Sequence, residues 1–153
     1  MHALNKSRSC AIIVTYNPDF TALLKLIGQL KKETDFIIVD NGTLDIPYIE
    51  ESINVYNRCR EIICLKKNEG LAKALNIGIH WCLKEEYEFV FLFDQDSSLC
   101  DLFVDRMINA FFDASGEAGK NIAALGPRII NPQTMRQTSF KLFNKFIFRS
   151  DRK

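Results

Sequence analysis

The chain has 153 residues, enough for one domain with a sizeable hydrophobic core. Its 47% hydrophobic and 25% charged residues are typical of a globular protein, and a net charge of +1 argues against a nucleic-acid partner. The five cysteines form no CxxC pair and lie near no histidine cluster, so we expect reduced thiols in a cytoplasmic protein rather than a zinc or disulfide framework. We expect neither a secretory signal nor a membrane-spanning segment.

Apolar runs typical of buried strands alternate along the chain with segments of helical period. Strands are predicted at residues 10–15, 35–39, 61–65 and 89–93, with a short fifth strand at 121–125. Such repeated β-α-β units imply an α/β fold with a mainly parallel, Rossmann-like sheet and helices on both of its faces.

The helices are predicted from their start signals and their apolar spacing. Asn17 is a good N-cap and Pro18 a good first helical residue, and Ser98 and Asp101 have the spacing of a capping box. Further helices are predicted at residues 49–56 and from Leu71 onward.

Polar clusters follow three of the first four predicted strands. These clusters are residues 15–17 (Thr-Tyr-Asn), 40–42 (Asp-Asn-Gly) and 94–96 (Asp-Gln-Asp), and the third strand runs into residues 67–70 (Lys-Asn-Glu-Gly). Right-handed crossovers bring the carboxyl ends of neighbouring parallel strands to one edge of the sheet, where ligands bind in open α/β folds. The sequence therefore predicts a single polar crevice built from all four segments.

Asp94 and Asp96 are the most informative pair in the chain. Two carboxylates one residue apart at a strand end repel each other unless a cation lies between them, and hard oxygen ligands suit Mg²⁺ or Mn²⁺. The pair therefore indicates a metal-bridged diphosphate site. The simpler interpretation of this tripeptide is a strand-to-loop turn.

Simpler interpretations also apply to other candidates. Asp40 fits an Asp-Asn-Gly turn that needs no function, and Lys73 fits a solvated helix face. His80 and Trp81 are expected to be structural residues near a helix end. Only the convergence of Asp40 with Asp94 and Asp96 favours a role in binding.

Four segments carry a resemblance to a known family. They are residues 12–18 (Ile-Ile-Val-Thr-Tyr-Asn-Pro), 39–42 (Val-Asp-Asn-Gly), 68–78 (Asn-Glu-Gly-Leu-Ala-Lys-Ala-Leu-Asn-Ile-Gly) and 93–96 (Phe-Asp-Gln-Asp). In order and spacing they resemble family 2 glycosyltransferases of the GT-A fold. The Asp-Gln-Asp form and residues 125–128 (Leu-Gly-Pro-Arg) resemble the bacterial rhamnosyltransferase branch most.

The resemblance implies a role for each matching position. Asp40 would contact the pyrimidine base, Asp94 would lie on the ribose side, and Asp96 would ligate the Mg²⁺ or Mn²⁺ that bridges the diphosphate, with Asp94 beside it. The remaining nucleotide-binding positions implied in this way are Thr15, Asn17, Asn41, Asn68, Gly70, Lys73 and Gln95, the last of them beside the sugar.

The chain departs from the family in length and in its catalytic base. Family members are about twice as long, and their general base is an acidic residue in the second half. Between Gly126 and Lys153 the only carboxylate is Asp151, in a charged segment. We therefore expect a truncated GT-A fold, with residues 1–132 as the nucleotide-sugar-binding domain, residues 133–153 as a basic, aromatic start of the acceptor-side half, and the general base outside the chain.

Two functions follow from this interpretation. The first is a rhamnosyltransferase-like glycosyltransferase that uses dTDP-rhamnose or a UDP-sugar and a glycan or lipid-linked acceptor in cell-surface polysaccharide synthesis. The second is a non-catalytic module that binds nucleoside diphosphates. A nucleotide-binding domain of another doubly wound class is a third alternative, although no Gly-rich turn follows the first strand. The basic, aromatic tail allows peripheral attachment to the inner face of the membrane, and uncovered apolar surface allows homo-oligomers.

Overall fold

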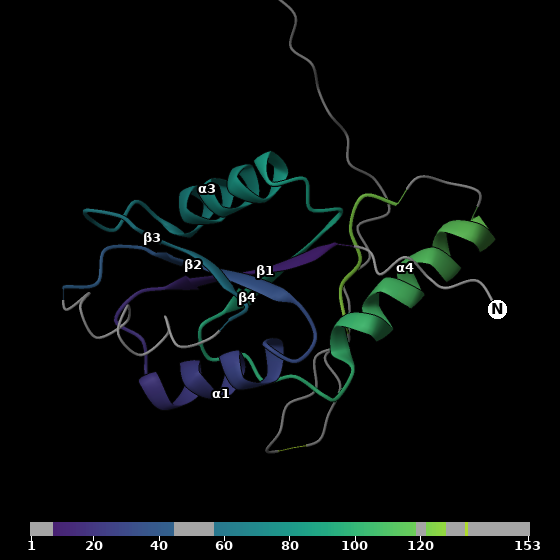
Figure 1. The fold of residues 1–153 in the computed structure, drawn as a ribbon, viewed down its shortest axis with the longest axis horizontal. Coiled ribbons are helices and arrows are strands. Elements are labelled where there is room, and N and C mark those ends of the chain that lie inside the picture. The colour runs from purple at the N-terminus through teal and green to yellow at the C-terminus, as the bar shows by residue number, and fades with distance from the viewer. Residues whose placement is uncertain (1–7, 45–56, 119–121, 128–133, 135–153) are drawn as a thin grey trace, which may run out of the picture.

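The structure, a computed structural model, describes residues 8–44, 57–118, 122–127 and 134 (Figure 1). Within these residues four strands form one sheet: β1 (Ser9–Thr15), β2 (Asp35–Asp40), β3 (Cys59–Cys64) and β4 (Phe89–Asp94). All pairings are parallel and the order across the sheet is β3-β2-β1-β4. The predicted parallel sheet is confirmed, and its four strands lie close to the predicted limits.

Helices cover both faces of this sheet, as the β-α-β pattern predicts. They are α1 (Phe20–Leu30), α3 (Leu71–Lys84) and α4 (Phe103–Ala118). Figure 1 shows α1 and α3 on opposite sides of the strands. The central strand β1 explains why both faces are apolar: Ala11 and Ile13 pack with α1, whereas Ile12 and Val14 pack with α3. Residues of a strand alternate between its faces, so a strand buried on both sides is apolar throughout.

Helix α4 packs against the phenylalanines of β4. Phe89 lies edge-on to Phe111, and Phe91 and Phe93 both contact Phe103 at ring-centroid distances of 6.3 and 5.8 Å. Phe89, Phe91 and Phe93 are two residues apart along the strand and therefore share a face of the sheet. This contact holds the connection between β4 and α4 near the carboxyl edge of the sheet.

Gly78 allows α3 to lie directly on β1. A Cβ atom at this position would be 2.7 Å from Cγ2 of Ile12, closer than carbon atoms pack. Gly78 is buried, and its missing side chain therefore determines how closely α3 approaches the sheet.

Two helix starts differ from those that the sequence predicts. Asp19, not Asn17, is the N-cap of α1, because its carboxylate accepts hydrogen bonds from the N–H groups of Thr21 and Ala22. The predicted capping box of Ser98 and Asp101 does not form. Helix α4 begins at Phe103, and Oε2 of Glu33, a residue distant in sequence, accepts the N–H of Val104 at 2.8 Å. Tertiary contact has replaced a local cap.

The predicted fifth strand is also wrong where it can be compared, because residues 122–127 form neither helix nor strand. Its apolar residues are too few to decide between a strand and an extended loop. Asn121, the predicted helix at 49–56 and all of the 133–153 segment except Thr134 lie outside the described residues. No helix of the described part is long and apolar enough to span a membrane.

Candidate functional site

The carboxyl ends of β1, β2 and β4 meet at one edge of the sheet. The strand register pairs Thr15 with Asp40 and Val14 with Asp94. The pairing of β2 with β3 ends at Asp40 and Cys64, so the loop after β3 reaches the same edge. The predicted convergence of the four polar segments is thus present in the fold.

Asp40 lies at the centre of this edge with no exposed surface. Its Oδ1 accepts hydrogen bonds from the hydroxyls of Thr15, at 2.8 Å, and of Thr43. Its Oδ2 accepts the backbone N–H groups of Gly42 and Thr43 at 3.1 and 2.7 Å. A buried carboxylate is tolerated when its oxygens are satisfied in this way. Asp40 therefore organises the end of β2, and both of its oxygens already have protein partners.

Thr43 connects the end of β2 to the loop after β1, a role that the sequence did not suggest. Its hydroxyl donates to Asp40 and accepts the N–H of Asn17 at 3.0 Å. Asn17 has a φ of 45°, a left-handed conformation that asparagine tolerates better than most residues. The signal available in the sequence was the spacing of Asp40 and Thr43, which is typical of a turn closed by an aspartate side chain.

Asn41 and Asn68 join the loops that follow β2 and β3. Nδ2 of Asn41 donates to Oδ1 of Asn68 at 3.1 Å, while Oδ1 of Asn41 accepts the N–H of Glu69 at 2.9 Å. Oδ1 of Asn68 also accepts the N–H of Gly70 at 2.9 Å. These bonds make the two asparagines one unit at the start of α3.

Gly42 and Gly70 give these loops their shape. Gly42 has a φ of +93°, and a Cβ atom there would lie 2.6 Å from the backbone nitrogen of Asn68. Gly70 has a φ of +88° and is the N-cap of α3, with no side-chain hydrogen bond to the first helical N–H groups. Any other residue would be strained at Gly42 and would separate the two loops.

Lys73 lies on the first turn of α3 and is more than half exposed. Its Nζ is 2.8 Å from Oε2 of Glu69, and the hydrogen bond from Lys73 lowers the pKa of Glu69. An exposed pair of this kind contributes little to stability. The ammonium group of Lys73 can therefore leave Glu69 and bind another anion at the carboxyl edge of the sheet.

Asp94 is the last residue of β4, and Gln95 and Asp96 form the turn that follows it. The N–H of Ser97 donates to the carbonyl of Asp94 at 3.1 Å, and the side chains of Asp94 and Asp96 are exposed. Neither carboxylate has a hydrogen-bond or ion-pair partner within the described residues. This is the opposite of Asp40, whose carboxylate is fully engaged.

The donor set of this turn suits a hard divalent cation. The part of the chain that the structure describes holds no group of three or more His, Cys, Asp or Glu side chains placed to bind a metal ion. Mg²⁺ is commonly held by one or two carboxylates, with water and substrate phosphates completing its shell. Two free carboxylates at a strand end fit that pattern and do not fit a closed structural metal site.

Tyr16 is a further residue of this edge that the sequence did not single out. Tyr16 is 47% exposed, whereas the residues of β1 before it are buried. An exposed aromatic ring beside polar side chains offers a flat surface for a planar ligand. Its position between Thr15 and Asn17 was the available signal.

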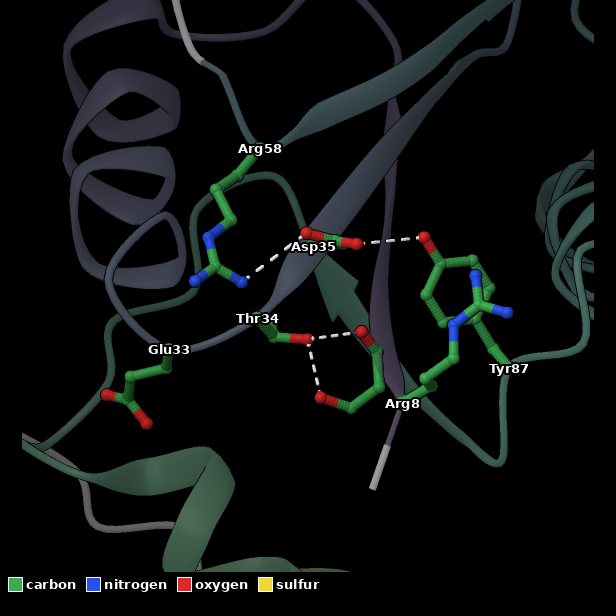
Figure 2. A pocket seen from close by; sticks show the side chains of 7 residues that line it. Arg8, Glu33, Thr34, Asp35, Arg58 and Tyr87 are labelled. Carbon is green, nitrogen blue, oxygen red and sulfur yellow. Dashed lines mark hydrogen bonds and ion pairs between the residues drawn. The ribbon is translucent and has the colours of Figure 1, made fainter. Parts of the chain in front are cut away.

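A second polar cluster occupies the opposite edge, at the amino ends of the strands. Figure 2 shows Asp35 between Arg58 and the hydroxyl of Tyr87, beside a hollow of about 160 Å³. Tyr87 donates to Oδ2 of Asp35 at 3.0 Å, and Nε of Arg60 lies 3.0 Å from the same atom. Burial opposes ionisation of Asp35, but the hydrogen bonds from Arg60 and Tyr87 outweigh it and lower the pKa of the carboxyl. These groups satisfy one another, so the cluster is structural.

Comparison with known proteins agrees with this arrangement. The model of the family described as glycosyl transferase family 2 matches residues 10–151. The chain is 35% identical over 97 residues to dTDP-rhamnosyl transferase RfbF of Shigella flexneri, an alignment that covers 63% of this chain and 32% of that protein.

Solved structures agree in fold. S. aureus TarS 1-349 matches with a TM-score of 0.54 at 24% identity, over 71% of this chain and 33% of that chain. The same TarS fragment in complex with UDP gives the same values. Its complex with UDP-GlcNAc gives a TM-score of 0.54 at 23% identity, over 71% of this chain and 32% of that chain. The α/β fold is thus of the GT-A type, and the chain spans about a third of the length of these relatives.

Proposed function

This chain belongs to glycosyl transferase family 2, and we propose that it binds a nucleotide-diphospho-sugar at the carboxyl edge of its sheet, as the donor side of a glycosyltransferase. The observation that carries the proposal is the contrast between two kinds of side chain at that edge. Hydrogen bonds hold Thr15, Asp40 and Asn41 in a rigid frame, whereas Asp94 and Asp96 are exposed and have no partner among the residues that the structure describes. Ligand sites of open α/β sheets occupy this edge.

We extend the proposal to a pyrimidine nucleotide donor, with dTDP-rhamnose first and UDP-sugars second. The similarity to a dTDP-rhamnosyl transferase supports the first, and the similarity in fold to TarS, whose structure was solved with UDP and with UDP-GlcNAc, supports the second. The half-exposed ring of Tyr16 would stack against the base. The proposal includes a role in cell-surface polysaccharide synthesis, as the resemblance to bacterial rhamnosyltransferases implies.

Asp94 and Asp96 would hold a Mg²⁺ or Mn²⁺ ion that also contacts the diphosphate. Bound there, the ion would act as a Lewis acid on the leaving diphosphate. Lys73, in the first turn of α3, would leave its partner Glu69 and bring a second positive charge to the diphosphate. The hydrogen bonds around Asp40 would hold the part of the site that faces the base and the ribose in a fixed conformation.

The proposal is tested by isothermal titration calorimetry of the purified chain with dTDP and UDP. We expect tight binding in Mg²⁺ or Mn²⁺ and much weaker binding in EDTA. A purine nucleoside diphosphate under the same conditions is the control for base recognition. Equal affinity with and without the cation would exclude the metal site, and equal affinity for purine and pyrimidine would exclude the assignment of the base.

A further inference from the structure

The side chain of Gln95 continues the pairing of β4 with β1 beyond the last pair of the strands. The strand register ends at Val14 and Asp94. One residue beyond the end of β4, Oε1 of Gln95 accepts the N–H of Tyr16 at 2.8 Å. Nε2 of Gln95 donates to the carbonyl of Tyr16 at the longer distance of 3.4 Å. The amide group of the side chain thus takes the place that a peptide group of a neighbouring strand would have.

This contact acts on the two carboxylates that flank it. Within the described residues, the turn at 94–97 is otherwise closed only by the hydrogen bond from Ser97 to Asp94, and the carboxylates of Asp94 and Asp96 have no partner of their own. A flexible turn would let two like charges move apart. Gln95 fixes the turn to the rigid end of β1 and so limits that movement.

We propose that Gln95 is a positioning residue that holds Asp94 and Asp96 in place for a divalent cation by binding the backbone of Tyr16. The proposal rests on the metal site of the proposed function. It adds a role to the expectation that Gln95 lies beside the donor sugar, because both polar atoms of its amide bind the backbone of Tyr16. Groups that orient metal ligands commonly change metal affinity by about 10- to 100-fold when they are removed.

The chain offers a matched control for this contact. Gln29 of α1 binds the backbone of Leu99 in the same way, with Nε2 donating to the carbonyl at 2.7 Å and Oε1 accepting the N–H at 3.2 Å. Leu99 lies in the same connection between β4 and α4, but beyond the two carboxylates. Gln95→Met and Gln29→Met therefore remove equivalent pairs of hydrogen bonds and keep the length of the side chain.

The first measurement needs no metal. Amide hydrogen exchange of the metal-free protein should show the N–H of Tyr16 protected in the parent and in Gln29→Met, and unprotected in Gln95→Met. Gln95→Ala should behave as Gln95→Met does. Protection of Tyr16 that persists in both Gln95 variants would overturn the proposal, because the contact would then not hold the backbone.

The second measurement is a titration with Mn²⁺ in the presence of dTDP, followed by calorimetry. Gln95→Met should weaken Mn²⁺ binding by about tenfold or more, while Gln29→Met stays close to the parent. Thermal unfolding without metal should change similarly in the two variants. If both variants bind Mn²⁺ as the parent does, or if both lose the same affinity, the positioning role is refuted. A parent that does not bind Mn²⁺ refutes the proposed function itself, an outcome that the parent titration alone reveals.

Discussion

At the scale of single residues, the carboxylates of the carboxyl edge divide into two kinds. Asp40 is fully buried and accepts hydrogen bonds through both oxygens, so it stabilises the frame. Asp94 and Asp96 are exposed and have no partner within the described residues. Three aspartates that look alike in the sequence are therefore expected to respond differently to substitution.

Asp96→Ala should abolish the effect of Mg²⁺ on nucleotide binding, because it removes a proposed ligand of the ion. It should leave the fold intact, because it removes one of two like charges that no group of the described residues neutralises. Calorimetry of dTDP with and without the cation measures the first effect, and thermal unfolding the second. Asp101→Ala changes another exposed aspartate of the same connection and should leave the metal effect unchanged. A retained metal effect in Asp96→Ala would remove Asp96 from the site.

Asp40→Ala should act on the fold first. It leaves the hydroxyls of Thr15 and Thr43 and two backbone N–H groups without their buried partner, so we expect a loss of about 1–3 kcal/mol in the free energy of unfolding. Urea denaturation measures this loss. Nucleotide affinity should fall as the frame loosens, with the ratio of affinities in Mg²⁺ and EDTA unchanged. Unchanged stability together with unchanged affinity would make Asp40 only a turn residue.

At the scale of elements, the approach of α3 to β1 decides where the loop of Asn68 lies. Helix α3 begins directly after this loop, and its buried face packs against the side of β1 that carries Ile12. Gly78 permits the close contact, and Gly42 lets the loop pass next to the end of β2. Small residues at these two positions therefore position the amide pair of Asn41 and Asn68.

Two glycines in helices should give opposite results when changed to alanine. Gly78→Ala places a methyl group against Ile12 and should destabilise the fold by about 1–3 kcal/mol. Gly28→Ala, in α1, meets nothing within 4 Å and should stabilise it by about 0.5–1 kcal/mol, because alanine favours the helix. Chemical denaturation of the two variants measures both. Equal stabilisation in the two would mean that α3 does not lie as closely on β1 as described.

At the scale of the whole molecule, the amino and carboxyl edges of the sheet differ in whether their carboxylates are paired. At the amino edge, Asp35 of β2 forms ion pairs with Arg58 and with Arg60 of β3. It also accepts the hydroxyl of Tyr87, which lies just before β4 (Figure 2). At the carboxyl edge, Asp94 and Asp96 have no such partners within the described residues. The Asp35 cluster at the amino edge therefore stabilises the fold, and the carboxyl edge is the side that we propose for ligand binding.

The Asp35 cluster makes stability depend on acid pH. The pKa of Asp35 in the folded protein lies below its ordinary value of 3.8, so the ionised carboxylate stabilises the fold above that pH. This stability is lost as the pH falls through the folded pKa. Asp35→Asn should therefore be less stable than the parent from neutral pH down to about pH 4, and the difference should shrink below it.

Urea denaturation of parent and variant across this pH range measures the difference. Glu61→Gln changes an exposed acid of β3, the edge strand that carries Arg60, and should show no such pH-dependent gap. A gap that stays constant into acid would mean that the cost of Asp35→Asn is not electrostatic.

The sequence by itself determined the succession of strands along the chain and the kinds of residue that follow each strand. Continuous apolar runs require strands buried on both faces, and Asp, Asn and Gly after each run require polar loops, so the parallel sheet and the convergence of Thr15, Asp40, Asn68 and Asp94 followed from local patterns and topology. The resemblance to family 2 glycosyltransferases came from the order and spacing of the same segments, and the match of the family model confirmed it.

Only the tertiary structure decided which of these side chains are engaged and which are free. Local signals placed the start of α4 at Ser98 and Asp101, but Glu33, in the turn after α1, accepts the N–H of Val104 in the first turn of α4. Asp40, Gln95 and Asn41 each have a partner that is distant in sequence, at Thr15, Tyr16 and Asn68, which lie 25, 79 and 27 residues away. Hydrogen bonds over such separations depend on how strands and loops pack, a property that residue type and spacing do not encode locally.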